Sequence, residues 1–252
     1  MTHDFNAAIL DEVAHRPWPM PDRPWVMTQT WNDLLFAHWV VDAAQLRSRV
    51  PDHFELDLYD GVAWLAIVPF HMTNVAPRGV PSLPWVSEFA ELNVRTYVRV
   101  GNRPGIYFFS LDAGSALAVQ AARTLFNLPY YTAMMHVGWT GAGAVEYSSS
   151  RASMPPADLR TTYEPAGPPF VPKAGTLEYF LTERYCLYNI DRGGQPYRLE
   201  IHHPPWSLEV AAATITQNTM ADVNGIGVSG APNLLHFAKR QDAVAWLPER
   251  IP

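Results

Sequence analysis

Polar and apolar residues alternate along the segment ELNVRTYVRV, residues 91–100. Its even positions up to 98 carry Leu, Val and Thr, whereas its odd positions carry charged, amide or phenolic side chains. Because successive side chains of a strand point to opposite faces, this pattern predicts a β-strand with one apolar and one polar face. A second segment, residues 62–70, is almost wholly apolar, which is typical of a strand covered on both faces.

Other strand patterns are separated by short turns. Hairpins are predicted for residues 54–72, turning at Asp60-Gly61, for residues 130–151 around TGAGA, and for residues 183–203, turning at 191–194. Further strands are predicted at residues 34–40, 105–113, 159–165, 207–216 and 234–246. About ten strands with hairpin-length connections predict an α+β protein, mostly antiparallel β, with its sheet closed into a barrel or cone.

Helical periodicity is confined to short segments at residues 5–15, 41–51, 115–126 and 176–181. The third of these, SALAVQAARTLF, is predicted to end before Pro129, because proline cannot continue a helix. Two adjacent tyrosines, Tyr130 and Tyr131, then open a strand. One of them is expected to face inward and the other outward.

Composition and charge restrict the classes of function. Aromatic residues make up 12% of the chain, with nine Trp, whereas charged residues make up 17%, which suits a thick core or an aromatic-lined pocket. The net charge is −6 and the basic residues are scattered, so no nucleic-acid partner is expected. The N-terminus does not resemble a signal peptide, and no apolar run is long enough to span a membrane. A cytoplasmic protein without a membrane partner is therefore expected.

Metal and nucleophile motifs give no positive signal. The sequence has no G-x-S-x-G elbow and no H-E-x-x-H motif, and the segment GIGVSG lies in a predicted loop without a strand–turn–helix context. The single cysteine, Cys186, excludes an internal disulfide and a multi-cysteine metal site. His202 and His203 are adjacent on a predicted strand, so their side chains point to opposite faces and do not readily chelate one ion. No metal and no cofactor are expected.

Several stretches resemble a known family. AAQLRSRVPDHFEL and AARTLFNLPYY are similar, in order and separation, to two segments of the acetoacetate decarboxylases. With FAELNVRTYV, ERYCLYN, HHPPWSLE and LLHFAKRQDAVAW, the chain resembles the YqjF-like proteins of the acetoacetate-decarboxylase-like superfamily over most of residues 28–250. The resemblance implies a single-domain β-cone or barrel with a buried pocket, often in homo-oligomers. Residues 1–27 are assigned to an N-terminal helix and Pro-rich lead-in, and residues 28–252 to this domain.

The same resemblance locates a candidate site. Where the decarboxylases carry two adjacent lysines, one of which forms a Schiff base, this chain has Tyr130 and Tyr131. A phenol cannot form an imine, so acetoacetate decarboxylation by that route is not expected. Asn32 stands where the family has a functional arginine, whereas Glu91 matches the active-site carboxylate of the family.

Strand alternation extends the candidate site from Glu91 to Asn93 and Arg95, which share its face. From sequence alone such a face is expected to be solvated, whereas the resemblance turns it toward the pocket. A buried Arg95 needs a paired carboxylate or offers an anion-binding fork. The inward-facing tyrosine, Tyr130 or Tyr131, either fills the pocket floor or donates a hydrogen bond to a ligand.

Further candidates lie in the predicted hairpin 183–203. Glu183 and Tyr185 open its first strand, where they serve either a site or a surface ion pair. His202 is preferred over His203 as the proton-transfer group, because His203 shares an apolar face and core packing is its default. The ordinary histidine pKa of about 6.5 suits proton transfer near neutral pH.

Three functions are compatible with these residues. The first is a lysine-independent lyase, isomerase or hydrolase acting on a small carbonyl or carboxylate compound. It uses Glu91 or His202 as the acid–base group, Arg95 as the anion clamp and a tyrosine as hydrogen-bond donor. The second is a non-catalytic protein that binds or senses an apolar or aromatic small molecule. The third is a structural oligomer with a filled cone, which predicts no cavity of about 300 Å³ or more.

Overall fold

The computed structural model describes residues 4–82, 87–191 and 193–251. The strands are β1 (Met27–Val41), β2 (Glu55–Leu56), β3 (Ala63–Pro77), β4 (Phe89–Val100), β5 (Arg103–Ala113), β6 (Tyr130–Thr132), β7 (Met134–Trp139), β8 (Val145–Arg151), β9 (Ala157–Pro165), β10 (Cys186–Ile190), β11 (Pro196–His202), β12 (Glu209–Asn218), β13 (Leu234–Ala245) and β14 (Glu249–Arg250). The helices are α1 (Ala43–Arg47), α2 (Ala116–Leu125) and α3 (Leu177–Thr182), with 3₁₀ turns η1 (Ala7–Asp11) and η2 (Asp222–Asn224). None of these helices in the described part of the chain is long and apolar enough to cross a bilayer.

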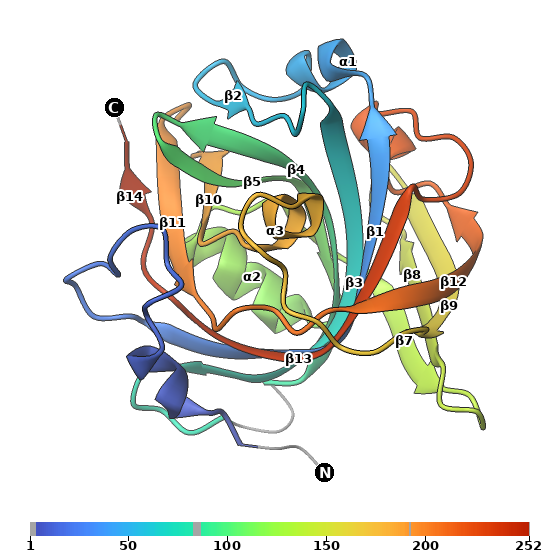
Figure 1. Ribbon diagram of the computed structural model, residues 1–252, viewed down its shortest axis with the longest axis horizontal. Helices are drawn as coiled ribbons and strands as arrows, with labels where there is room; N and C mark the ends of the chain where they lie inside the picture. The colour runs from blue at the N-terminus through green and yellow to red at the C-terminus, as the bar shows by residue number, and fades with distance from the viewer. Residues whose placement is uncertain (1–3, 83–86, 192, 252) are drawn as a thin grey trace.

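The central strands form a closed barrel (Figure 1). Their order is β11–β10–β5–β4–β3–β1–β13, and β13 pairs back with β11 through Ala245 opposite Ile201 and Val244 opposite His202. Neighbouring strands of this ring are antiparallel except β10 and β5. The ring leaves no free edge among these strands, as in other closed sheets. The predicted α+β fold of mostly antiparallel β-structure is confirmed.

Side chains from the barrel wall and from two helices form a core inside the barrel. Inward-facing side chains such as Phe36 of β1 and Phe70 of β3 form an apolar core with Val119 of α2 and Leu181 of α3. In Figure 1 both helices lie within the outline of the ring. The inward-facing side chains of the barrel are therefore largely apolar.

A second sheet packs against the outside of the barrel. It has the order β12–β9–β8–β7 and is joined to the barrel where Val210 of β12 pairs with His236 of β13. Leu92 and Val94, on the outward face of β4, share a second apolar core with Tyr147 and Leu159 of this sheet. Both faces of β4 are therefore buried, so that its polar side chains lie inside the protein.

The predicted hairpin at residues 54–72 is wrong in its first arm. Glu55 and Leu56 pair with Arg99 and Val98 of β4, and only a bridge between residues 59 and 62 closes the turn at Asp60-Gly61. The reason is that β3 already has β1 and β4 on its two edges, so no edge remains for the preceding segment.

Other differences concern short elements. The hairpin predicted for residues 130–151 is confined to β7 and β8, because β6 pairs in parallel with β5. The helix predicted for residues 5–15 is reduced to the turn η1. A strand of two residues, such as β14, is too short to show alternation, so the pattern does not predict it.

Candidate functional site

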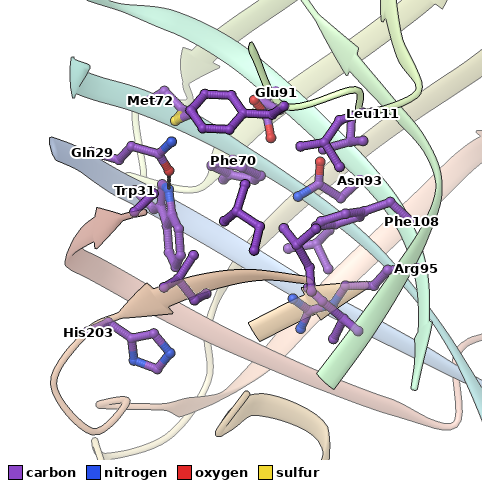
Figure 2. A pocket seen from close by; sticks show the side chains of 18 of the residues that line it. Gln29, Trp31, Phe70, Met72, Glu91, Asn93, Arg95, Phe108, Leu111 and His203 are labelled. Atoms are coloured by element: carbon purple, nitrogen blue, oxygen red, sulfur yellow. Dashed lines mark hydrogen bonds between the residues drawn. The ribbon is translucent and has the colours of Figure 1, made fainter. Parts of the chain in front are cut away.

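The barrel encloses a cavity of about 430 Å³, which lies in the size range of natural small-molecule sites. Figure 2 shows aromatic and aliphatic side chains around a row of polar side chains from β4. Among the described lining residues, Pro77 and Leu125 are exposed, so the cavity opens to solvent near the ends of β3 and α2. A cavity of this size does not fit the hypothesis of a filled cone.

Glu91, Asn93 and Arg95 form the polar row of the cavity, all on one face of β4. Their backbone neighbours on the flanking strands are apolar: Phe70, Val68 and Ala66 on β3, and Ala113, Leu111 and Phe108 on β5. Each polar group therefore lies between apolar neighbours, which makes its charge state sensitive to burial.

Glu91 is a buried carboxyl group at one end of this row. Its Oε2 accepts a hydrogen bond of 3.0 Å from the hydroxyl of Tyr130. Burial raises the pKa of Glu91 to about 8, although the hydrogen bonds of Tyr130 and Asn93 act in the opposite direction. The carboxyl group is therefore mostly protonated at neutral pH and titrates within the physiological range.

The two adjacent tyrosines face opposite sides of the barrel wall. Tyr130 lines the cavity, and its backbone carbonyl accepts a hydrogen bond of 2.7 Å from Nε of Arg123. Tyr131 does not line the cavity; its ring lies 3.9 Å from the guanidinium carbon of Arg151, which is paired with the buried Asp112. Burial and the nearby Glu91 raise the pKa of Tyr130 well above its ordinary value, so the phenol stays neutral and acts as a donor.

Arg95 lies at the other end of the row and is only 8% exposed. Its Nη2 donates to the carbonyl of Leu181 at 3.4 Å, and its guanidinium carbon lies 5.4 Å from the centre of the Phe36 ring. Among the described residues, no carboxylate forms an ion pair with Arg95. The neighbouring Arg184, in contrast, is paired with Asp57 at 2.5 Å. Arg95 is thus a buried cation without a neutralising carboxylate in the described part of the cavity wall.

Several buried polar atoms of the cavity have no hydrogen-bond partner among the described residues. They are Nε of Arg95, Oδ1 of Asn93 and Nε1 of Trp206. Two of them are donors and one is an acceptor. Buried polar groups in proteins are nearly always hydrogen-bonded, so three unpaired atoms in residues that line one cavity are exceptions to this rule.

His202, the last residue of β11, and His203, which follows it, face the opposite way from the expectation. His203 lines the cavity, whereas Nε2 of His202 lies 2.7 Å from the carbonyl of Ile9 in the N-terminal segment, outside the barrel. Burial lowers the pKa of each to about 4. Nδ1 of His203 lies 2.7 Å from the carbonyl of Pro204 and thus donates to it. The outward position of His202 removes it from contact with any ligand in the cavity.

Asn32 also points away from the cavity. Its Nδ2 donates to Oγ1 of Thr73 at 2.9 Å and to the carbonyl of His71 at 3.2 Å. The next residue, Asp33, has a φ of +49°, and the register between β1 and β3 shifts after Asn32. Leu34 and Phe36 line the cavity, so unbroken alternation would turn Asn32 inward too; the irregularity at Asp33 shifts the alternation by one residue, and Trp31 lines the cavity instead.

Glu183 and Tyr185 lie behind the cavity wall. Oε1 of Glu183 accepts from the backbone N–H of Trp206 at 2.9 Å, and its Oε2 accepts from the Tyr185 hydroxyl. The Tyr185 ring stacks on His203 with 4.7 Å between ring centres. Neither residue lines the cavity, but both hold side chains that do.

The cavity wall contains no lysine in the described part of the chain. Lys173 is exposed in a loop, and Lys239 is 71% exposed and pairs with Asp33. A protein amine is therefore not available to form an imine with a ligand in the cavity. The described residues also contain no group of three or more His, Cys, Asp or Glu side chains arranged to hold a metal ion.

Two contributors to the site had no signal in the sequence. Trp206 lies in the segment after β11, where no periodicity indicates its direction. Tyr147 of β8 donates from its hydroxyl to the backbone carbonyl of Glu91 at 2.7 Å, which ties the second sheet to β4. A resemblance in sequence segments does not reveal such a contact between distant strands.

Comparisons with known proteins agree with this architecture. The YqjF protein of Bacillus subtilis (strain 168) is 47% identical over 227 residues, which cover 90% of this chain and 93% of that protein. An acetoacetate decarboxylase-like enzyme from Sphingomonas wittichii RW1 superposes with a TM-score of 0.63 at 11% identity, covering 94% and 97% of the two chains. The enduracididine biosynthesis enzyme MppR, in complex with pyruvate, gives a TM-score of 0.61 at 12% identity, covering 91% of each chain.

These similarities confirm the resemblance to YqjF-like proteins and the acetoacetate decarboxylase-like fold. The DUF2071 family, described as an uncharacterized conserved protein, matches residues 28–242. The chain therefore belongs to the DUF2071 family.

Proposed function

We propose that this protein binds a small organic acid carrying a carbonyl group in its barrel cavity and catalyses proton transfer next to that carbonyl. No imine with the protein is involved. The observation that carries the proposal is the presence of two groups in one cavity of about 430 Å³: Arg95, a buried cation without an ion-pair partner among the described residues, and Glu91, a carboxyl group with a pKa of about 8.

Arg95 supports the choice of an anionic ligand. A guanidinium group matches a carboxylate with two parallel hydrogen bonds, and Nε of Arg95 has no partner among the described residues. The cost of burying an unpaired charge is offset when an anionic ligand arrives. A neutral apolar ligand leaves that charge uncompensated, so the alternative of a protein that only binds apolar or aromatic molecules is less well supported.

Glu91 and Tyr130 support the choice of proton transfer. A general base works best when its pKa lies near the working pH, and the pKa of Glu91 is about 8. Glu91 in its ionised form removes a proton from the carbon beside the carbonyl; the C–H electrons form the carbon–carbon double bond of an enolate, and the electrons of the carbonyl π bond move to oxygen. Once Glu91 is protonated, the Tyr130 hydroxyl turns its hydrogen bond from Glu91 to the enolate oxygen, and Glu91 then returns the proton to carbon.

The structural neighbours support an oxo acid as the substrate class. MppR, which shares this fold, is in complex with pyruvate, an oxo acid. The present cavity has no lysine in its described wall, so the same class of compound is handled here without a Schiff base. Borohydride treatment with an oxo acid is therefore expected to leave the mass of the protein unchanged.

The test is exchange of carbon-bound protons in D₂O, followed by NMR for a panel of oxo acids of different lengths. The wild type is expected to exchange the protons beside the carbonyl of at least one compound, and Glu91→Gln to slow that exchange at least a hundredfold. Glu164→Gln, which changes an exposed carboxylate on β9, is the matched control and should behave as wild type. Binding that depends on Arg95 without exchange of any compound would show that the protein binds without turnover.

A further inference from the structure

The polar groups of the cavity are widely spaced along one strand. Glu91 and Arg95 are four residues apart on β4, which corresponds to about 13 Å between their Cα atoms in an extended strand. Figure 2 shows them at opposite ends of the row, with Asn93 between them. The described side chains form no ion pair between Glu91 and Arg95, so a ligand that touches both must span most of the row.

The space between the two ends is apolar. Val68 and Leu111 flank Asn93 on the neighbouring strands and also line the cavity. Asn93 offers one free acceptor, Oδ1, in the middle of the row. The body of the ligand is therefore a hydrocarbon chain or ring, with room for a single hydrogen-bond donor near its middle.

The charges of the cavity set the charge of the ligand. Arg95 has no paired carboxylate among the described residues, Arg184 is balanced by Asp57, and burial keeps His203 neutral. Glu91 at the far end is mostly protonated at neutral pH. The cavity therefore compensates one negative charge, at the Arg95 end, and a second carboxylate beside Glu91 would be buried without a cation.

Building on the function proposed above, we infer that the ligand is an elongated monocarboxylic acid whose carbonyl group is remote from its carboxylate. The carboxylate binds Arg95, the apolar body lies along Asn93, and the carbonyl oxygen reaches the Tyr130 hydroxyl and Glu91. A 2-oxo acid, in which the two groups are adjacent, cannot contact Arg95 and Glu91 at the same time.

The experiment compares two isomers of identical composition, 7-oxooctanoate and 2-oxooctanoate, by calorimetric titration. The wild type is expected to bind the first at least tenfold more tightly, because only that isomer reaches both polar ends. Octanedioate is expected to bind more weakly than 7-oxooctanoate, because it carries a second charge to the Glu91 end. Arg95→Leu should lose binding of both isomers, Arg95→Lys should retain part of it, and Tyr130→Phe should reduce the preference between the isomers to less than threefold.

The outcomes separate this inference from the proposed function. Equal or tighter binding of 2-oxooctanoate that still depends on Arg95 overturns the remote carbonyl and leaves the proposed function standing. If neither isomer shows binding that depends on Arg95, and no oxo acid of the panel exchanges its protons, the proposed function fails as well. Urea unfolding of each variant verifies that lost binding does not reflect a lost fold.

Discussion

Two buried arginines line the cavity near α3, and they differ in whether a carboxylate pairs with them. Arg184 pairs with Asp57, whereas Arg95 has no such partner in the described part of the chain. A buried charge without a partner destabilises the folded state, and removing one member of a buried pair does the same to the member that remains.

We therefore expect opposite effects of the same substitution at the two arginines. Arg95→Leu should raise the free energy of unfolding of the ligand-free protein by about 1 kcal/mol, because it removes an uncompensated charge. Arg184→Leu should lower it by about 3 kcal/mol, because Asp57 loses its cation. Urea denaturation measures both, and a marked loss of stability in Arg95→Leu would show that Arg95 is already compensated.

A second prediction at the residue scale concerns how the free energy of unfolding depends on pH through Glu91. Its pKa is about 8 in the folded protein and near 4.5 when unfolded, so between these values the folded state holds a proton that the unfolded state releases. The free energy of unfolding should therefore fall as pH rises from 5 to 8, by up to about 1.4 kcal/mol per pH unit, and level off above. Tyr130 and Tyr147, which also face Glu91, have raised pKa values and stay neutral throughout.

The measurement is urea unfolding of wild type and Glu91→Gln across this pH range. In Glu91→Gln the free energy of unfolding should fall less steeply between pH 5 and 8, because the contribution of Glu91 is missing. Glu164→Gln, which changes an exposed side chain, should show the same pH dependence as wild type. Parallel curves for wild type and Glu91→Gln would mean that the buried carboxyl has an ordinary pKa.

At the scale of elements, β4 is held from both sides of the barrel wall. Its inner face carries the polar row, and its backbone is tied to the second sheet where the Tyr147 hydroxyl donates to the carbonyl of Glu91. A hydrogen bond of the same type is made by Tyr163 of β9, whose hydroxyl donates to the carbonyl of Asp33 at 2.7 Å. The two contacts have the same chemistry, but only the first reaches a residue of the polar row.

Tyr147→Phe and Tyr163→Phe form a matched pair. Each should lower the free energy of unfolding by about 1 kcal/mol, because a buried carbonyl loses its donor. Only Tyr147→Phe should also weaken the binding of an anionic ligand that reaches Glu91, by a few-fold in Kd. Calorimetric titration distinguishes the two variants, and equal affinities in both would exclude a positioning role for Tyr147.

The elements also show what the sequence could predict. The alternation in residues 91–100 correctly groups Glu91, Asn93 and Arg95 on one face of a strand. It does not reveal that this face is buried, because a solvated polar face has the same period, and only closure of the barrel decides between them. The family resemblance supplied the inward direction for Glu91.

Which side chain faces the cavity was harder to predict where tertiary contacts decide its orientation. Alternation separates His202 from His203 but does not indicate which one faces the cavity; the N-terminal segment covers the outer side and receives His202. Asn32 faces outward because of the irregularity at Asp33, which a period of two does not contain. The same period correctly placed Tyr130 and Tyr131 on opposite sides.

At the scale of the whole molecule, buried ion pairs connect the second sheet and the N-terminal segment to the barrel. Arg151 of β8 joins the second sheet to Asp112 of β5, and both side chains are at most 1% exposed. Arg16 joins the N-terminal segment to Glu200 of β11, which also pairs with Arg103 and Arg198. The first is an isolated pair, whereas the second belongs to a network.

We expect the isolated pair to be the more sensitive. Arg151→Met should cost about 3–5 kcal/mol of stability, because Asp112 is then buried without a cation. Arg16→Met should cost clearly less, because Glu200 retains two arginines. Thermal and urea unfolding of the two variants test this order, and a larger loss in Arg16→Met would contradict it.

The position of the cavity opening has a kinetic consequence. Pro77 and Leu125 are exposed lining residues, whereas Arg95 is buried and donates to the carbonyl of Leu181 in α3. The described wall of the cavity is mostly apolar, so a carboxylate that binds Arg95 sheds its hydration shell as it enters. We expect slow association and a long residence time, with the carbonyl end of the ligand remaining closest to solvent.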